Sequence, residues 1–514
     1  MSMNGAESLV HTLLASGVDT CFANPGTSEM HFVAALDRIP GMRCVLGLFE
    51  GVVTGAADGY ARMAGKPAAT LLHCAPGLSN GLANLHNGRR AHTMMVNCVG
   101  DQATYHRPLD APLTGDTEGF ARGVSGWVRT ATRAQDVGSD AAVAVQAARS
   151  APGHIATLIL PSDTCWDAGG VVAEPLPVPV PQPAAPSDIA HVARLLRSGA
   201  PVMFILGNGA LRAEPIATAH AIAAATGARL MAQTSNARIE RGAGRHAIDR
   251  VPYPVDQAIA ALTGVKHVVL VGAQKPTGFF AYPGKPGLMY PPDAEVHVLA
   301  RVEHDLPATL RALAEELNAP AVAPLPAPLQ TVATGAVTSA SLGRSLAALM
   351  PEGAIVADES VSFGRGLYPG THGAAPHDWL QLTGGAIGEG LPLATGAAVA
   401  CPDRRVVTLQ ADGSAMYTVQ ALWTQARERL NVTTVILANR KYAILLGELA
   451  GVGANPGRTA LDMMDLGNPD LDWVKIAGGM GVEAARAETM EQFNDLFAAA
   501  NRRAGPFVIE LVIP

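Results

Sequence analysis

Short, continuous runs of apolar residues alternate along this chain with longer stretches in which apolar positions recur at helical spacing. An uninterrupted run of aliphatic and β-branched residues is typical of a strand that is buried on both faces. Such strands, joined by helical stretches, favour parallel pairing in a layered α/β fold. The predicted strands are residues 20–23, 45–49, 68–73, 93–99, 202–206, 267–271, 406–410 and 432–437.

Two proline-rich stretches divide this pattern into three parts. Residues 174–187 and 318–330 are rich in proline, which is typical of extended, semi-rigid linkers. They predict three domains, at residues 1–173, 188–318 and 331–514. All three parts contain strands joined by helical stretches. We therefore expect an α/β protein with three doubly wound parallel-sheet domains.

Composition and charge argue against some classes of function. Of the 514 residues, 48% are hydrophobic and 16% are charged, and the net charge is −7 without a long basic run. This argues against nucleic acid or an anionic membrane as the main partner. The longest apolar stretch, residues 391–401, is too short to span a bilayer, and the polar start does not resemble a signal peptide. Six cysteines without a CxxC pair suit reduced thiols, so we expect a cytoplasmic protein.

Polar residues follow two neighbouring predicted strands. Asp412, Gly413 and Ser414 come after the strand at 406–410, and Asn439 follows the strand at 432–437. The stretch between them places on one helical face Met416, Val419, Leu422, Trp423 and Ala426. In such a βαβ unit both polar groups lie at the same carboxyl edge of the sheet. A carboxylate and an amide oxygen there suit Mg²⁺, and the N–H groups of Gly413 and Ser414 suit an anion. Read alone, the same residues also fit an ordinary turn.

Glu50 and His73 are the candidates in the first part of the chain. Glu50 lies at a strand end amid apolar neighbours, which disfavour the charged carboxylate and suit it to share a proton with a heterocycle nitrogen. His73 ends a strand at the same edge, near the turn of residues 24–28, where a histidine suits proton transfer. Each has a structural alternative: Glu50 as a helix-start residue stabilised by the dipole, and His73 as a hydrogen-bonded strand end.

Asp412 and Asn439 are 27 residues apart, and this spacing resembles the signature of thiamine diphosphate (ThDP) enzymes, GDG followed by about 25 residues and NN. Ala411 and Ala438 replace the first Gly and the first Asn of that signature. Neither replaced position supplies a metal oxygen, so the resemblance still implies Asp412, Asn439 and the backbone carbonyl of Lys441 as the Mg²⁺ ligands.

The first part of the chain resembles the pyrimidine-binding domain of the same family. The resemblance is closest to benzoylformate decarboxylase and to the acetolactate synthase-like proteins, and the last part resembles their diphosphate-binding domain. The motifs that carry it are Asn24-Pro25-Gly26-Thr27, the helix that begins near Glu50, His73 with Asn80, and the loop 383–388. The resemblance implies catalytic roles for Glu50, His73 and Thr27. It implies cofactor contacts by Asn24, Pro25, Gly26, Asn80, Gly385, Ile387, Asp412, Gly413, Ser414 and Tyr442.

The same resemblance implies the reaction. ThDP would attack the carbonyl of a 2-oxo acid, carbon dioxide would leave, and the product would be an aldehyde or, with an aldehyde or ketone acceptor, an acyloin. Ile387 would hold the cofactor bent, and the Gly385 carbonyl and Glu50 would contact its pyrimidine. In this family Glu50 of one chain meets the diphosphate domain of another, so a homodimer or homotetramer is expected.

Substrate choice is left open. Residues 277–282 lack the second pocket histidine of the benzoylformate decarboxylases, and Glu448 is the one carboxylate in the aliphatic stretch 442–448. We favour an acetolactate synthase-like lyase or carboligase with ThDP and Mg²⁺; FAD is not expected. The alternatives are an aryl 2-oxo acid decarboxylase, an inactive ThDP-binding partner subunit, and an oxidoreductase that binds a nucleotide at residues 207–209.

Overall fold

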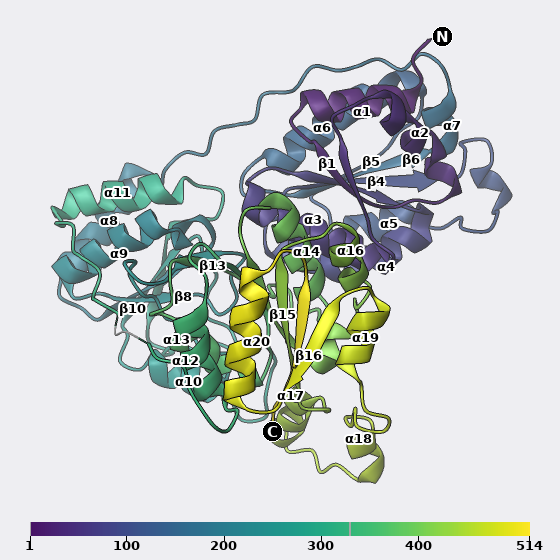
Figure 1. Cartoon of the computed structure of the whole chain (residues 1–514). Helices are drawn as coiled ribbons and strands as arrows, with labels where there is room; N and C mark the ends of the chain where they lie inside the picture. The colour runs from purple at the N-terminus through teal and green to yellow at the C-terminus, as the bar shows by residue number, and fades with distance from the viewer. Residues whose placement is uncertain (1, 328–329) are drawn as a thin grey trace.

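The computed structural model describes residues 2–327 and 330–514, so the second predicted linker, residues 318–330, lies partly outside the described residues. Figure 1 shows three α/β domains, each with its own sheet. The predicted fold class is confirmed, because each of the three sheets is built mainly from parallel strands. The residue boundaries of the three domains stay a prediction.

The first sheet has six parallel strands with helices on both faces. Its order is β2 (Arg43–Leu46), β1 (Thr20–Asn24), β3 (Ala68–Leu72), β4 (Met95–Asp101), β6 (Ile155–Pro161) and β5 (Trp127–Thr130). One face packs against α1 (Gly5–Ala15), α2 (Met30–Arg38), α6 (Val137–Arg149) and α7 (Ser162–Trp166). The other packs against α3 (Glu50–Ala64), α4 (Cys74–Arg90) and α5 (Thr117–Arg122). The extended stretch between α7 and the central domain runs along the top of Figure 1.

The central sheet has four parallel strands. Its order is β11 (Glu295–Ala300), β10 (His267–Val271), β7 (Val202–Leu206) and β8 (Arg229–Ala232). The helices α8 (Pro186–Arg197), α9 (Ala213–Thr226) and α11 (Leu306–Leu317) cover one face, and α10 (Val255–Ala261) covers the other.

The third sheet has seven strands, and one of them comes from the central part of the chain. Its order is β16 (Glu483–Ala487), β17 (Phe507–Val512), β15 (Val432–Ala438), β14 (Val406–Ala411), β12 (Ile355–Glu359), β13 (His377–Gln381) and β9 (Ile239–Arg241). The short strand β9 pairs antiparallel to β13, so the central and third domains share a sheet edge. The flanking helices are α12 (Ser339–Leu349), α13 (Leu367–Gly370), α14 (Gly390–Ala400), α16 (Ala421–Arg427), α19 (Trp473–Gly479) and α20 (Met490–Arg502).

The helical stretch predicted after Asp412 is interrupted, so that part of the prediction is wrong. Helix α15 (Asp412–Ala415) ends after one turn, and α16 begins only at Ala421. The chain turns between them because the Thr418 hydroxyl donates to the carbonyl of Gly388, 2.8 Å away, in another loop. Val419 and Leu422 are nevertheless buried in one apolar cluster, as the helical pattern predicted.

The first and third domains pack closely through α3 and α14, which lie between their sheets (Figure 1). Glycines allow this approach: a Cβ on Gly59 would lie 2.0 Å from the carbonyl oxygen of Leu393, and one on Gly396 would lie 1.7 Å from that of Ala56. The two helices are therefore in backbone contact.

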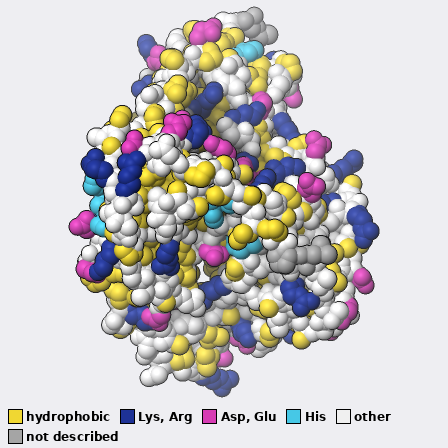
Figure 2. Space-filling view, turned by 90° about the vertical axis from the view of Figure 1, so that its left-hand side faces the viewer, with side chains coloured by type: hydrophobic (Ala, Val, Ile, Leu, Met, Phe, Trp, Pro, Cys, Tyr) yellow, Lys and Arg dark blue, Asp and Glu magenta, His cyan; other side chains and the backbone are white. Residues whose placement is uncertain are grey.

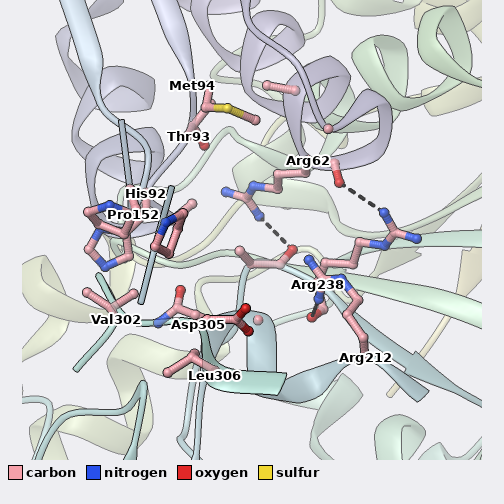
Figure 3. Close-up of a pocket in the computed structure, with 18 of the residues that line it drawn as sticks. Arg62, His92, Thr93, Met94, Pro152, Arg212, Arg238, Val302, Asp305 and Leu306 are labelled. Carbon is pink, nitrogen blue, oxygen red and sulfur yellow. Dashed lines mark hydrogen bonds between the residues drawn. The ribbon is translucent and has the colours of Figure 1, made fainter. Parts of the chain in front are cut away.

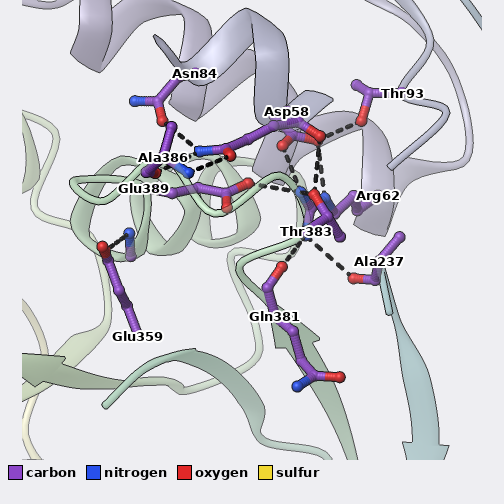
Figure 4. Close-up of polar contacts among 12 residues, drawn as sticks. Asp58, Arg62, Asn84, Thr93, Ala237, Glu359, Gln381, Thr383, Ala386 and Glu389 are labelled. Atoms are coloured by element: carbon purple, nitrogen blue, oxygen red, sulfur yellow. Dashed lines mark hydrogen bonds and ion pairs between the residues drawn. The ribbon is translucent and has the colours of Figure 1, made fainter. Parts of the chain in front are cut away.

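A buried ion network joins the same two domains (Figure 4). The Arg62 guanidinium lies 2.6 Å from Asp58 on its own helix and 2.6 Å from Glu389 next to α14. It also donates to the carbonyl of Gln381 at 2.7 Å. Burial alone would lower the pKa of Arg62, but Asp58 and Glu389 raise it above its ordinary value. The arginine stays charged and ties the third domain to the first.

Among the described residues, no helix combines the length and the apolar character that crossing a membrane requires.

Candidate cofactor and active site

The third sheet places Asp412 at its carboxyl edge, directly after β14. The Asp412 carboxylate accepts the backbone N–H of Gly413 at 2.8 Å and that of Arg440 at 2.7 Å. Burial raises the pKa of the Asp412 carboxyl above its ordinary value, and these N–H groups act against the rise. In the described part of the chain, no lysine or arginine side chain pairs with Asp412. A divalent cation would supply the missing positive charge, so the donor set fits a metal.

Asn439 follows β15, the parallel neighbour of β14, so the predicted adjacency of the two strands is confirmed. Its side-chain oxygen accepts the N–H of Lys441 at 3.2 Å. Arg440, between them, has a φ of 57° and turns the chain sharply. Tyr442 lies over the start of α15, because a Cβ on Gly413 would come within 2.5 Å of the tyrosine ring. The structure thus gathers Asp412, Gly413, Asn439, Lys441 and Tyr442 at one edge.

Ser414 ends a buried polar chain that the sequence analysis did not identify. The Gln410 amide donates to the Ser414 hydroxyl at 2.6 Å and to the Glu359 carboxylate at 3.1 Å. Glu359, the last residue of β12, also accepts the N–H groups of Gly388 and Gly390 at 2.6 and 2.5 Å. Burial raises the pKa of Glu359, and these donors act against it. The only sequence signal for this residue is an acidic side chain at the end of an apolar strand.

The loop between β13 and α14, which contains Gly385 and Ile387, is held from the first domain. Asn87 on α4 donates to the carbonyl of Ala386 at 2.7 Å and accepts its N–H at 3.2 Å. Gly385 has a φ of 82°, which favours glycine, and a Cβ there would lie 2.5 Å from the ring of Phe279 in the central domain. All three domains therefore meet at this loop.

The other side of the loop is held from both the third and the first domain. The Gly388 carbonyl accepts the Thr418 hydroxyl at 2.8 Å and the Asn84 amide at 3.3 Å. Ile387 is half-buried between these two anchored residues. Hydrogen bonds to Ala386 and Gly388 therefore hold the backbone on both sides of Ile387.

The first sheet places Glu50 at the start of α3. The side chain is buried, and the Asn80 amide on α4 donates to its Oε2 at 3.0 Å. Gly77 leaves room for the carboxylate, because a Cβ there would lie only 3.0 Å from Glu50 Oε1. Glu50 and Asn80, predicted separately from the sequence, are therefore in contact.

His73 precedes α4 and is held by a glutamate that the sequence analysis missed. Its Nδ1 lies 2.9 Å from the carboxylate of Glu29, which is buried and also accepts the N–H of Gly26 at 2.7 Å. A carboxylate only accepts, so Nδ1 carries a proton in this contact, and in the neutral tautomer the lone pair is on Nε2. The sequence signal for Glu29 is its place three residues after Gly26, the spacing of a capping box.

The turn of residues 24–28 lies against His73. A Cβ on Gly26 would lie 2.3 Å from the imidazole ring, so only glycine lets the turn approach this closely. Asn24 and Pro25 are half-buried, and Thr27 is exposed. The Ser28 hydroxyl lies 3.3 Å from His73 Nδ1.

The predicted residues thus form two groups within one chain. One lies at the carboxyl edge of the first sheet around Glu50 and His73, and the other lies at the carboxyl edge of the third sheet around Asp412. No hydrogen bond or ion pair among the described residues joins Glu50 or His73 to Asp412 or Asn439. Asn87 on helix α4 links the first domain to the loop around Ile387.

Helix α17 (Ala443–Gly451) continues from Tyr442 toward the central domain. Its Glu448 accepts the hydroxyl of Tyr282 at 2.8 Å and that of Tyr253 at 3.4 Å. Burial and the Glu448 charge raise the pKa of both tyrosines. Tyr253 also packs against Phe279, with ring centroids 5.3 Å apart. Because Phe279 contacts the loop at Gly385, this cluster borders the candidate site.

A separate cavity of about 490 Å³ lies between the first and central domains (Figure 3). Arg62, Arg212 and Arg238 line one side, and His92 and Asp305 line the other. Burial lowers the pKa of Arg212 to about 10. The cavity borders residues 208–209, where the sequence analysis weighed nucleotide binding, and that binding stays untested. No predicted catalytic or cofactor residue lines this cavity.

Comparison with known proteins agrees with this geometry. Residues 3–121 match the N-terminal TPP-binding domain of thiamine pyrophosphate enzymes, and residues 369–511 match the C-terminal TPP-binding domain. A Mycobacterium tuberculosis protein, provisionally named acetolactate synthase large subunit IlvX, is 54% identical over 100% of this chain and 99% of its own. The benzoylformate decarboxylase of Pseudomonas aeruginosa is 30% identical over 96% of each chain.

Solved structures show the same architecture. The thiamine diphosphate-dependent 4-hydroxybenzoylformate decarboxylase of Rhodococcus jostii RHA1 superposes with a TM-score of 0.84, at 26% identity and 99% coverage of both chains. The benzoylformate decarboxylase of Polynucleobacter necessarius, at 22% identity and a TM-score of 0.80, shows the shared fold over 99% of both chains. The chain belongs to the thiamine pyrophosphate (thiamine diphosphate) enzymes, and the resemblance inferred from its motifs is confirmed.

Proposed function

We propose that the protein is a ThDP- and Mg²⁺-dependent enzyme that cleaves the bond between the carboxylate and the carbonyl carbon of a 2-oxo acid. The remaining fragment leaves as an aldehyde or is joined to an aldehyde or ketone acceptor. The observation that carries the proposal is the buried Asp412 carboxylate beside Asn439, which has no basic partner among the described residues. In the same chain, Glu50 is buried at the start of α3. The named relatives support both outcomes.

The residues present fit the cofactor. Asp412, Asn439 and the Lys441 carbonyl would hold Mg²⁺ on the diphosphate, and the N–H groups of Gly413 and Ser414 would contact it. When bound, ThDP supplies the carbon nucleophile and accepts the electron pair that carbon dioxide leaves behind. Glu50 would hold a proton at the pyrimidine, with Asn80 fixing its Oε2. A carboxyl group suits this role because it is both donor and acceptor.

His73 would handle the substrate's protons. Glu29 keeps the proton on Nδ1, so Nε2 can accept a proton or a hydrogen bond from the reacting groups. The N–H of Gly26 donates to the Glu29 carboxylate, and the Ser28 hydroxyl contacts His73 Nδ1. Together these contacts hold the imidazole in one orientation. Glu29 is therefore a positioning residue that acts through His73.

The separation of the two residue groups within one chain supports a homodimer. Glu50 and Asp412 are fixed in different sheets by their own neighbours, and no contact in the described part of the chain brings them together. A second copy that sets its Glu50 opposite Asp412 would complete the site, and a homodimer, alone or paired into a tetramer, provides this by symmetry.

Glu448 bears on the choice of substrate. Two tyrosine hydroxyls donate hydrogen bonds to its carboxylate, which borders the candidate site. Such an anion disfavours a second negatively charged substrate. We expect a neutral aldehyde to be the better acceptor, which works against pyruvate in that role.

A second candidate function is decarboxylation of an aryl 2-oxo acid. Phe279 lies with its ring centroid 5.3 Å from that of Tyr253 and 5.0 Å from that of Phe280, and this aromatic cluster favours a planar substrate. Against it, residues 277–282 provide no histidine as a second proton donor. An inactive partner subunit is disfavoured because Glu50, His73, Asp412 and Asn439 are all present.

The test is product analysis of the ThDP- and Mg²⁺-loaded enzyme with pyruvate or benzoylformate, each alone and with a neutral aldehyde. Acyloin from pyruvate plus aldehyde supports the carboligase, and exclusive free aldehyde supports the decarboxylase. Glu448→Gln, which keeps the acceptor oxygen for Tyr282, should raise acetolactate formation from pyruvate alone. Glu7→Gln, in the capping box of α1, is the control. An unchanged ratio of products would refute the role of Glu448.

A further inference from the structure

Three histidines and a glutamate gather on the central domain, away from the candidate active site. Glu295 and His297 are two residues apart on β11, so their side chains share one face of the sheet. His267 on β10 pairs in register with Glu295, and His191 on α8 lies over the same face. Figure 2 looks toward the side of the molecule that carries this domain, where histidine side chains reach the surface.

Three of these side chains present donor atoms at the spacing of metal ligands. His267 Nδ1 lies 3.1 Å from His297 Nε2, and Glu295 Oε2 lies 3.6 Å from the first and 3.7 Å from the second. A circle through three atoms with these separations has a radius of about 2.0 Å, which is the length of a zinc–nitrogen or zinc–carboxylate bond. The three donor atoms therefore lie at the separations that ligands of one bound ion have.

From this geometry we propose that His267, His297 and Glu295 form a binding site for a divalent transition metal, with Zn²⁺ as the fitting ion. Two imidazoles and one carboxylate are a zinc ligand set, and the 71% exposure of Glu295 leaves the remaining position to water. The ion would join edge strand β11 to β10.

His191 completes the site as a supporting residue. Its Nε2 lies 3.2 Å from His297 Nδ1, the ring nitrogen that the metal does not use. A ligating histidine needs a partner for its second nitrogen, which fixes the tautomer and the ring orientation.

Among the residues that the structure describes, one other group of side chains has comparable spacing, at Glu29, His73 and Cys74. There the Glu29 carboxylate already accepts hydrogen bonds from Gly26 and His73, and burial raises the pKa of the Cys74 thiol to about 11. A protonated thiol and an occupied carboxylate make a poor zinc site. The two groups are far enough apart in the chain to be tested separately.

The experiment is calorimetric titration of the tag-free holoenzyme with Zn²⁺, in the presence of ThDP and excess Mg²⁺ to fill the hard oxygen site. We expect one Zn²⁺ per chain, with affinity lowered at least 100-fold in His297→Ala and about 10- to 100-fold in His191→Ala. His220→Ala is the matched control, because His220 and His246 stack on the same domain, 4.5 Å apart, without a carboxylate.

Absorption of the Co²⁺-loaded protein gives an independent readout of histidine coordination. A low-symmetry, tetrahedral-type spectrum in the wild type that is lost in His297→Ala supports the site. The proposal is overturned if the wild type binds no Zn²⁺ more tightly than millimolar, or if binding persists in His297→Ala. It is also overturned if binding disappears in His73→Ala, because the ion would then occupy the edge of the first sheet.

Discussion

Replacing Glu29 by glutamine tests how the fold prepares His73 for catalysis. The wild-type carboxylate accepts His73 Nδ1 at 2.9 Å and the N–H of Gly26 at 2.7 Å. Both donors reach the same oxygen, Oε2, while the Ser28 hydroxyl donates to Oε1 at 2.5 Å. A glutamine whose oxygen stays with Ser28 therefore turns its NH₂ group toward both donors. If the NH₂ group donates to His73 Nδ1, the proton of the imidazole moves to Nε2, and the lone pair that meets the substrate is lost.

The magnitude follows from these contacts. Loss of a correctly protonated acid–base group lowers turnover by about 10²- to 10⁴-fold, so we expect kcat/KM to fall within that range. One mispaired buried donor costs about 1–3 kcal/mol, which lowers stability without preventing folding. ThDP affinity should stay near the wild-type value, because Glu29 contacts His73 and its turn rather than Glu50 or Asp412.

Steady-state decarboxylation, with ThDP binding measured by calorimetry, separates these effects. Glu7→Gln is the matched control, since Glu7 has the same capping-box position in α1, where it accepts the Asn4 N–H at 3.0 Å. The reasoning is refuted if Glu29→Gln keeps the wild-type kcat/KM and pH profile, or if it loses only ThDP affinity.

Three further predictions follow from other parts of the structure. Asp412→Ala should weaken ThDP and Mg²⁺ binding by about 3–5 kcal/mol, and unchanged ThDP affinity by calorimetry would exclude the metal assignment. Glu50→Gln should bind ThDP but exchange its C2 proton at least about 10²-fold more slowly, and wild-type hydrogen–deuterium exchange would exclude that role. Burial lowers the pKa of His377 to about 3, so the folded protein keeps this imidazole neutral while the unfolded chain protonates below its ordinary pKa of about 6.5. Stability should therefore fall between pH 6.5 and 3, by about 1.4 kcal/mol per pH unit more than in His377→Gln, and parallel urea-unfolding profiles for the two proteins would contradict this.

The sheets were predictable because their strands are buried on both faces and appear as uninterrupted apolar runs. β7 and β10 begin and end at the predicted residues, and β14 and β15 extend the predicted runs by one residue each. Contacts outside the regular pattern were not predictable. β9 is only three residues long and joins a distant sheet, so no local period identifies it.

The candidate site was predicted where its residues follow strand ends. Glu50, His73, Asp412 and Asn439 all lie at carboxyl edges, as the topology requires. Glu29 was missed because its role depends on a contact with a residue 44 positions away. The contact of Glu448 with Tyr282 spans 166 positions, and only the packed central domain brings the two together.

The central claim is that this chain cleaves carbon dioxide from a 2-oxo acid, and release of labelled carbon dioxide tests it most directly. The measurement is ¹³C NMR of carboxyl-labelled pyruvate and benzoylformate, with and without a neutral aldehyde, incubated with the holoenzyme and with Glu50→Gln. The account predicts ThDP- and Mg²⁺-dependent ¹³CO₂ from at least one of them, and its loss in Glu50→Gln. If the wild type binds ThDP but releases no ¹³CO₂ from either, or if Glu50→Gln releases it at the wild-type rate, the account is contradicted.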